Sequence, residues 1–185
     1  MRISIENDGL YMVIDVEEDG RVSLRHFAPH PYDGRDTGCY YPLLELHFQG
    51  QNIDGHHGSR HTETYPAALL RYRDHRLEPR PGGRELTLSM AGGGVAVDMH
   101  YVLYDGVSAV RSWAEVENVG EAPQTLDYIT SFAYYGVSDG VEGSFEDKML
   151  FDIPYNTWHG ELQWHRKSAW ELGLMDMECP SLRRL

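Results

Sequence analysis

The chain has 185 residues, of which 16 are Lys or Arg and 29 are Asp or Glu, so its formal net charge is −13. Its length and its content of 41% hydrophobic residues suit one globular domain with a hydrophobic core. Lys148 and Lys167 are the only lysines. Such an acidic composition argues against binding to nucleic acid and against binding to an anionic membrane surface.

The lack of a recognisable targeting signal and the cysteine content predict a cytoplasmic protein. No apolar stretch approaches the roughly 20 residues of a membrane span, and the charged start MRISIENDGL is unlike a signal peptide. Cys39 and Cys179 lie far apart, which suits a reducing compartment better than a disulfide scaffold. They also lack the close spacing of structural zinc ligands, so we expect no metal.

Strand patterns occur throughout the chain, whereas no long stretch shows helical spacing. Residues 10–15 and 21–28 flank the turn at 18–20 and predict a hairpin. Residues 44–48 alternate between apolar and polar side chains, as a strand with one buried face does. Residues 70–77 are largely polar and predict a surface or edge strand.

Two further hairpins are predicted downstream. Residues 84–90 and 95–104 flank the glycines at 91–94, and residues 107–118 and 124–135 flank a turn at 119–123. Short strands at this spacing predict an all-β domain, a sandwich of antiparallel sheets over residues 1–185.

Two long polar segments, residues 30–41 and 49–66, interrupt this pattern and are either functional or disordered. The second contains His56, His57 and His61. The i, i+4 spacing of His57 and His61 converges on a metal only in a helix, which the neighbouring glycines disfavour. Two interpretations remain open: a loop held by its own hydrogen bonds, or a contact with a polar ligand.

Glycoside hydrolysis requires a pair of carboxylates, so acidic residues are candidates for this chemistry. Glu115 and Glu117 project from one strand face, where a solvated surface is the favoured interpretation. Glu161 lies between Trp158 and Trp164, an arrangement that suits either a sugar site or tryptophans that fill a core or an interface. Neither a nucleophile motif nor a phosphate-binding loop accompanies them, so we expect no catalytic residue in this chain.

Three ordered segments resemble bacterial α-galactosidases of glycoside hydrolase family 36. The first reads GQNIDGHHGSRHT from residue 50, although Gly55 and Glu63 depart from the family pattern. The second reads VRSWAEVEN from residue 110 and continues with Gly120 and LDY from residue 126. The third reads YNTWHGELQW from residue 155. The resemblance extends over residues 45–174, which is essentially the whole chain.

The resemblance implies a β-supersandwich of the galactose-mutarotase type, of which this chain would be one part. In this family the supersandwich precedes a (β/α)₈ barrel that carries the two catalytic aspartates. The nucleophile motif contains Lys-x-Asp, which is absent from these residues. We therefore expect an N-terminal accessory domain without the barrel, inactive alone, in an enzyme that needs no cofactor.

The resemblance also implies site residues and partners. Asp54 would bind a galactoside hydroxyl of a neighbouring subunit's active site in a homo-oligomer. His57 and Trp158 would join it in substrate binding, while His56 and Arg60 would hold the loop.

Two alternatives remain. A freestanding carbohydrate-binding module would use Trp158, Trp164 and the histidine-rich loop. A mutarotase-like epimerase would use His56 or His57 as the acid, with a carboxylate as the base.

Overall fold

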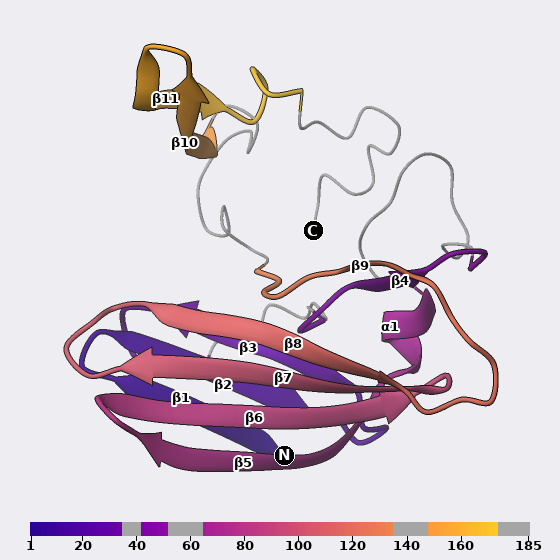
Figure 1. Cartoon of the computed structure of the whole chain (residues 1–185). Coiled ribbons are helices and arrows are strands. Elements are labelled where there is room, and N and C mark those ends of the chain that lie inside the picture. Colours follow the sequence, from indigo (N-terminus) through magenta and orange to yellow (C-terminus); the bar gives the residue numbers. More distant parts are fainter. Residues whose placement is uncertain (35–41, 52–64, 135–147, 174–185) are drawn as a thin grey trace. The chain divides into compact units, whose positions relative to one another are not determined.

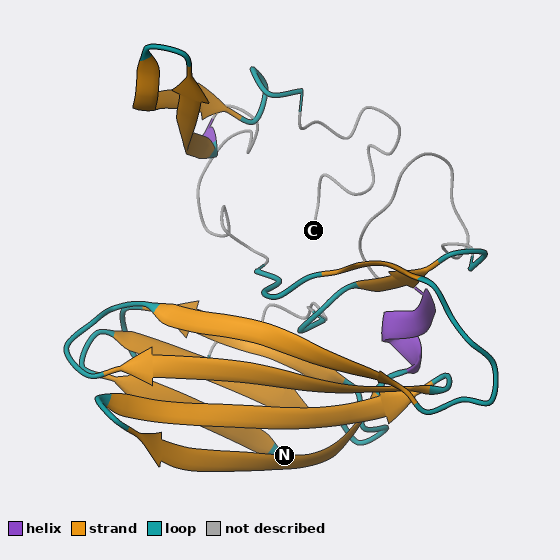
Figure 2. Ribbon diagram, viewed as in Figure 1, coloured by secondary structure: helices purple, strands orange, loops and turns teal. Residues whose placement is uncertain are grey.

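The computed structural model describes residues 1–34, 42–51, 65–134 and 148–173. Nearly all regular structure in them is antiparallel β-sheet (Figures 1 and 2), so the all-β prediction is confirmed. The chain forms two compact units, Met1–Tyr134 and Tyr135–Leu185. Each unit is described by itself below.

The first sheet has three strands in the order β1-β2-β3. Their bounds are Arg2–Asn7 (β1), Leu10–Val16 (β2) and Val22–Ala28 (β3). The hairpin β2–β3 matches the sequence prediction, whereas β1 was not predicted.

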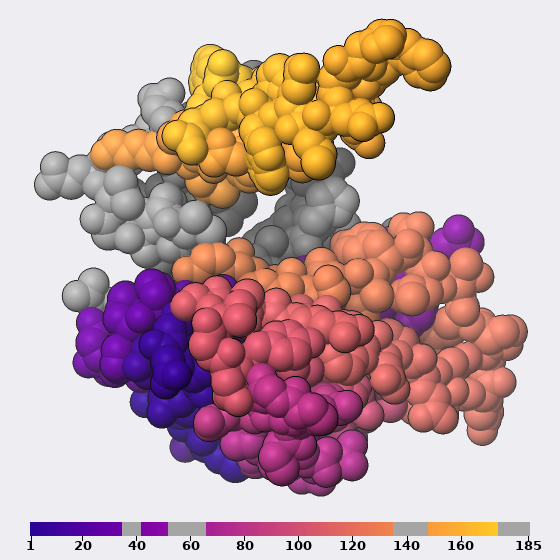
Figure 3. Space-filling model, turned by 60° about the vertical axis from the view of Figure 1, so that its left-hand side comes forward, coloured from indigo at the N-terminus to yellow at the C-terminus, as the bar shows by residue number. Residues whose placement is uncertain are grey.

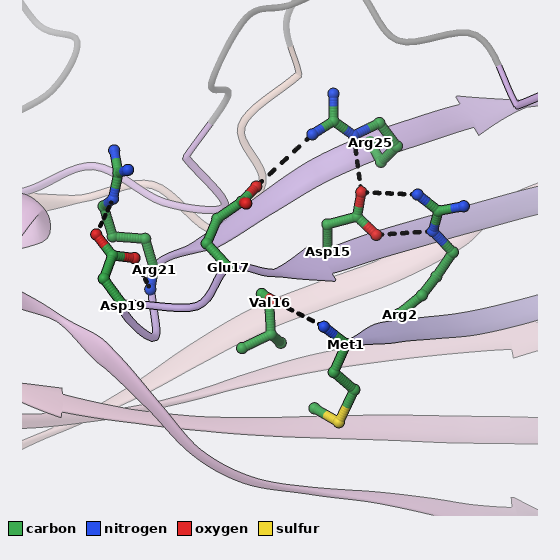
Figure 4. Close-up of polar contacts among 8 residues, drawn as sticks. All are labelled: Met1, Arg2, Asp15, Val16, Glu17, Asp19, Arg21 and Arg25. Carbon is green, nitrogen blue, oxygen red and sulfur yellow. Dashed lines mark hydrogen bonds and ion pairs between the residues drawn. The ribbon is translucent and has the colours of Figure 1, made fainter.

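Polar contacts hold β1 and β3 against β2 (Figure 4). The terminal amine of Met1 donates to the Val16 carbonyl at 2.7 Å. The Asp15 carboxylate accepts hydrogen bonds from Arg2, at 2.7 and 3.0 Å, and from Arg25 at 2.9 Å. A single carboxylate on β2 therefore joins all three strands of this sheet.

The second sheet has four strands in the order β5-β6-β7-β8. Their bounds are Arg71–Arg80 (β5), Gly83–Gly92 (β6), Val95–Tyr104 (β7) and Val110–Asn118 (β8). The edge position of β5 and the hairpin β6–β7 are as predicted. The hairpin predicted around residues 119–123 is wrong, because β8 pairs with β7 and the strand after it joins another sheet.

The two sheets lie face to face and bury one core between them (Figure 1), and in space-filling view their strands form one continuous body (Figure 3). Alternation produces this arrangement, because every second side chain of a strand faces the opposite sheet. The largest inward side chains are fully buried: Ile5, Met12, Ile14, Leu86, Leu88, Met99, Tyr101 and Leu103.

The described part of the first unit also contains a short two-stranded ribbon and a short helix. β4 (Leu46–Phe48) pairs antiparallel with β9 (Leu126–Ile129). The helix α1 (Tyr65–Leu69), which the sequence did not predict, contacts β4 and β6. Leu46 and Phe48 face the core, so their neighbour His47 faces away from it.

Residues 148–173, the described part of the second unit, contain an antiparallel hairpin, β10 (Leu150–Thr157) and β11 (Gly160–Ser168). No strand is predicted here from the sequence. Its turn carries Trp158 and His159, and His159 has a φ of 65°. Most side chains of this hairpin are exposed.

Candidate functional site

Four of the expected site residues fall in one segment that the structure does not describe. Asp54, His56, His57 and Arg60 belong to residues 52–64, which lie outside the described residues. The structure describes the chain on both sides of this segment. One side is β4 with the turn that ends at Gln51, and the other is α1.

His47 forms the centre of the contacts on the β4 side. Its Nε2 atom lies 2.8 Å from the carbonyl oxygen of Gln51, and its Nδ1 atom lies 3.1 Å from Asp127 Oδ2. The Tyr128 ring lies nearly parallel to the imidazole, with centroids 5.6 Å apart. The Gln51 amide donates to the Phe48 carbonyl at 3.2 Å and closes the turn. These contacts fix the last four residues before the segment.

Acidic and phenolic groups surround this histidine. Glu45 is buried. Its backbone amide donates to Thr130 Oγ1 at 2.8 Å, and its carbonyl oxygen accepts a hydrogen bond from the Thr130 amide at 3.0 Å. Burial raises the pKa of the Tyr128 hydroxyl, and the negative charges of Glu45 and Asp127 raise it further. On β9, the Asp127 carboxylate therefore lies against His47, and both carboxylates act on Tyr128.

Close backbone packing fixes α1, the element that directly follows residues 52–64. A Cβ atom at Gly92 would overlap the Leu69 carbonyl oxygen, so only glycine permits this approach of β6 to the end of α1. The guanidinium of Arg71 donates to the carbonyls of Ala68 and Leu70 at 2.7 and 2.8 Å. Both ends of the segment are thus tied to the sandwich.

The tryptophans of the second unit lie on its surface. Trp158 is 90% exposed at the hairpin turn, Trp164 is 66% exposed in β11, and Trp170 is 60% exposed. The interpretation that they fill a core is therefore wrong within the described residues. Glu161, which lies between the first two, is exposed as well.

One face of this hairpin combines an indole with an ion pair. Trp164 lies opposite Pro154. Arg166 and Asp152 form the next pair of residues on the same face, and the Arg166 guanidinium donates to both Asp152 oxygens, at 2.8 and 2.9 Å. This hydrogen bonding holds the pKa of Asp152 below its usual range. An exposed aromatic face beside fixed polar groups can stack on an apolar ring surface and bind hydroxyl groups.

The carboxylates on β8 behave as a solvated surface. Glu115 and Glu117 lie opposite Asp98 and Ala96 on one face of the sheet, and both are exposed. The Trp113 indole donates to Glu115 at 3.4 Å. The sequence interpretation of a solvated surface is therefore confirmed.

A buried polar cluster on the outer face of the same sheet escaped the sequence analysis. Glu85 is 2% exposed, and its Oε1 atom lies 2.7 Å from His100 Nδ1. Its other oxygen pairs with Arg80, while Trp113 stacks on the imidazole at 4.6 Å. Although burial opposes ionisation, the bond from His100 and the charge of Arg80 hold the pKa of Glu85 below its usual value. In the sequence, the pattern that indicates such a cluster is the alternation of polar residues with leucines along β6.

The described residues contain no group of three or more His, Cys, Asp or Glu side chains that could hold a metal ion. In the same residues, no helix has the length and apolar character needed to cross a membrane.

Comparisons with known proteins give a structural likeness only. No protein-family model matches the chain, and no curated protein matches its sequence. The α-galactosidase from Lactobacillus brevis matches 90% of this chain over 27% of its own, with 13% identity and a TM-score of 0.56. Two family GH36 α-galactosidases from Geobacillus stearothermophilus, AgaB and AgaA, match 63% and 64% of this chain over 21% and 22% of theirs. Each is 13% identical, with TM-scores of 0.43 and 0.42.

The chain therefore spans about a quarter of the length of the enzymes that it resembles. At this level of identity the likeness concerns the fold alone. The fold of the chain is similar to that of part of the α-galactosidase from Lactobacillus brevis.

Proposed function

We propose that the chain is the N-terminal accessory domain of a retaining α-galactosidase that acts on terminal α-galactosides of the melibiose and raffinose type. The likeness of 90% of the chain to the Lactobacillus brevis α-galactosidase carries this proposal. The three sequence segments that resemble family 36 support it independently. In this proposal the domain works in the cytoplasm, as part of a homo-oligomer.

The domain shapes the entrance to the active site and supplies no catalytic group. The intact enzyme hydrolyses its substrate by double displacement, through a covalent galactosyl intermediate on a barrel carboxylate. Asp54 accepts a hydrogen bond from a sugar hydroxyl in a neighbouring subunit, and His57 and Trp158 complete the contact. His56 and Arg60 hold the loop. The fixed ends of the segment, at Gln51 and α1, support this assignment.

The test is the Asp54→Asn substitution in the native, full-length enzyme. Removing the charge from this hydrogen bond should raise the KM for melibiose about tenfold, with a smaller change in kcat. Asp105→Asn, at an exposed turn of the same unit, is the matched control and should leave KM unchanged. An unchanged KM for both variants would contradict the role of Asp54.

The exposed hairpin tryptophans favour a second candidate, a freestanding carbohydrate-binding module. Indole faces stack on sugars, and the Asp152–Arg166 pair beside Trp164 offers hydroxyl ligands. This candidate predicts millimolar or tighter binding of melibiose by the isolated chain, lost in Trp164→Ala and kept in Trp170→Ala. The accessory-domain proposal predicts little binding by the isolated chain, because the barrel supplies most sugar contacts. Calorimetric titration of the chain distinguishes the two.

A further inference from the structure

The strand β5 lies at one edge of the four-stranded sheet (Figure 1), where one side of its backbone has no neighbouring strand among the described residues. Its pairing with β6 is regular from Asp74 to Arg80, and a register shift just before Asp74 ends this regular stretch. All side chains of residues 76–80 are exposed. Residues 74–80, called the β5 edge below, therefore form an open edge that another strand can extend.

The two faces of the β5 edge differ in chemistry. Four charged residues share its outer face, because alternate side chains of a strand point to the same side of the sheet. In chain order they are Asp74, Arg76, Glu78 and Arg80, so their charges alternate in sign. Leu77 points to the core side but is 51% exposed, so the opposite sheet leaves this end of β5 uncovered.

We propose that the β5 edge binds a second copy of this chain, and that the two edges pair antiparallel about a twofold axis at Leu77. The four-stranded sheets of the two copies then become one continuous sheet. In this register Arg76 lies opposite Glu78 of the second copy. Asp74 lies opposite Arg80 of the second copy in the same way. Because the axis repeats both contacts, each charge on the outer face of the edge meets an opposite charge.

The backbone supports the same register. A two-residue turn joins Arg80 to Gly83, which makes these residues a hydrogen-bonded pair of the β5–β6 ladder. Such pairs alternate along an antiparallel ladder, so the backbone groups of His75, Leu77 and Pro79 point away from β6. Leu77 of each copy then exchanges hydrogen bonds with Leu77 of the other. The His75 amide donates to the carbonyl of Pro79 in the second copy, and Pro79, which has no N–H, donates nothing in return.

The charges also exclude the neighbouring registers. Charged side chains usually protect an edge strand from unspecific pairing. If the second copy slides by two residues, like charges meet on the axis, with Arg76 opposite Arg76 or Glu78 opposite Glu78. Arg80 already pairs with Glu85, but its side chain is 53% exposed and its guanidinium has further N–H groups for Asp74 of the second copy. The pattern thus favours one register of self-pairing.

Charge reversal tests the register. In Arg76→Glu two of the ion pairs become contacts between carboxylates, and in Glu78→Arg they become contacts between guanidinium groups. Each variant alone should raise the dissociation constant of the β5 dimer about tenfold. An equal mixture of the two variants should regain the native affinity, because position 76 of one is complementary to position 78 of the other. Glu117→Arg, exposed on the opposite edge strand β8, makes the same charge change as Glu78→Arg and should have no effect.

Two substitutions of Leu77 test the backbone contact. Leu77→Pro removes the N–H that points away from β6 and should prevent the dimer, while the pairing of β5 with β6 needs no such group. Leu77→Ala keeps the N–H and should weaken the dimer less. Circular dichroism of each variant checks that the fold is kept, as expected for exposed positions.

Sedimentation velocity of the whole chain over a concentration series measures the dissociation constants. All these variants keep the hairpin β10–β11, so association through the hairpin is common to them. A native chain that stays monomeric at millimolar concentration would overturn the β5 dimer. Equal dissociation constants in all variants, or a mixture of Arg76→Glu and Glu78→Arg that associates no better than either alone, would overturn it as well. The pairing depends on β5 alone and holds whether or not the chain belongs to an α-galactosidase, which the KM of Asp54→Asn tests.

Discussion

Glu85 Oε1 and His100 Nδ1 lie 2.7 Å apart on the outer face of the four-stranded sheet, where both side chains are buried. The pair links β6 to β7, and Arg80 brings in the edge strand β5 through the second carboxylate oxygen. A buried carboxylate paired with two cationic or hydrogen-bonding side chains stabilises a sheet mainly because removing one member leaves the others without that partner.

Truncation of this carboxylate should therefore be costly. Glu85→Ala leaves His100 buried without its partner, and we expect the free energy of unfolding to fall by about 3 kcal/mol. Glu115→Ala is the control: it lies 3.6 Å from the other nitrogen of the same imidazole but is 68% exposed, and should cost less than about 0.5 kcal/mol. Urea denaturation of both variants measures the difference. Equal losses would mean that burial does not set the strength of these contacts.

The first sheet predicts a pH-dependent stability. The hydrogen bonds from Arg2 and Arg25 hold the pKa of Asp15 below its usual value, although burial acts in the opposite direction. A lowered native pKa adds stability that is complete above the unfolded value, about 4, and is lost as the pH falls through the native value. Asp15→Asn should thus destabilise the chain by about 1 kcal/mol at neutral pH and much less near pH 2. A constant difference between the two pH values would contradict this linkage.

The approach of β6 to α1 predicts an intolerant glycine. Gly92→Ala places a methyl group against the Leu69 carbonyl and should cost about 1–3 kcal/mol of unfolding free energy. At Gly120 a new Cβ meets its nearest neighbour, Asn118 Oδ1, at 3.4 Å, so Gly120→Ala should be nearly neutral. Thermal unfolding compares the two alanine variants. A stable Gly92→Ala protein would mean that α1 shifts freely.

The exposed side chains of the hairpin predict self-association of the isolated chain. Trp158, Leu162 and Trp164 are 90%, 72% and 66% exposed, and apolar surface of this extent associates in water. The triple serine variant should form nothing larger than the β5 dimer at concentrations where the parent chain forms larger species by light scattering. Because these side chains are exposed, the stability of the sandwich should change little. A parent chain that forms nothing larger than a dimer would contradict the expectation.

Local patterns predicted the strands whose partners are close in sequence. Leu86 and Leu88 alternate with polar residues, and the glycines after them signal the turn to β7. The turn around Gly120 was recognised, but its second strand pairs with Leu46 of β4, a partner that no local signal identifies. Pro154 within β10 lowers its strand propensity, which explains why that hairpin was missed.

The candidate site was predicted only in part for the same reason. Trp158 was identified from its motif, but its exposure depends on a hairpin that was not recognised. His47 was seen only as a member of an alternating strand. Its partner Asp127 lies 80 positions away, so this contact emerges only when β4 pairs with β9.

The most direct test of the central claim is the α-galactosidase activity of the native protein, captured from its source cells with an antibody raised against this chain. The account predicts a captured protein several times longer than 185 residues that hydrolyses nitrophenyl α-galactoside and not the β-anomer. A captured protein of the length of this chain, or a longer one without α-galactosidase activity, would contradict it.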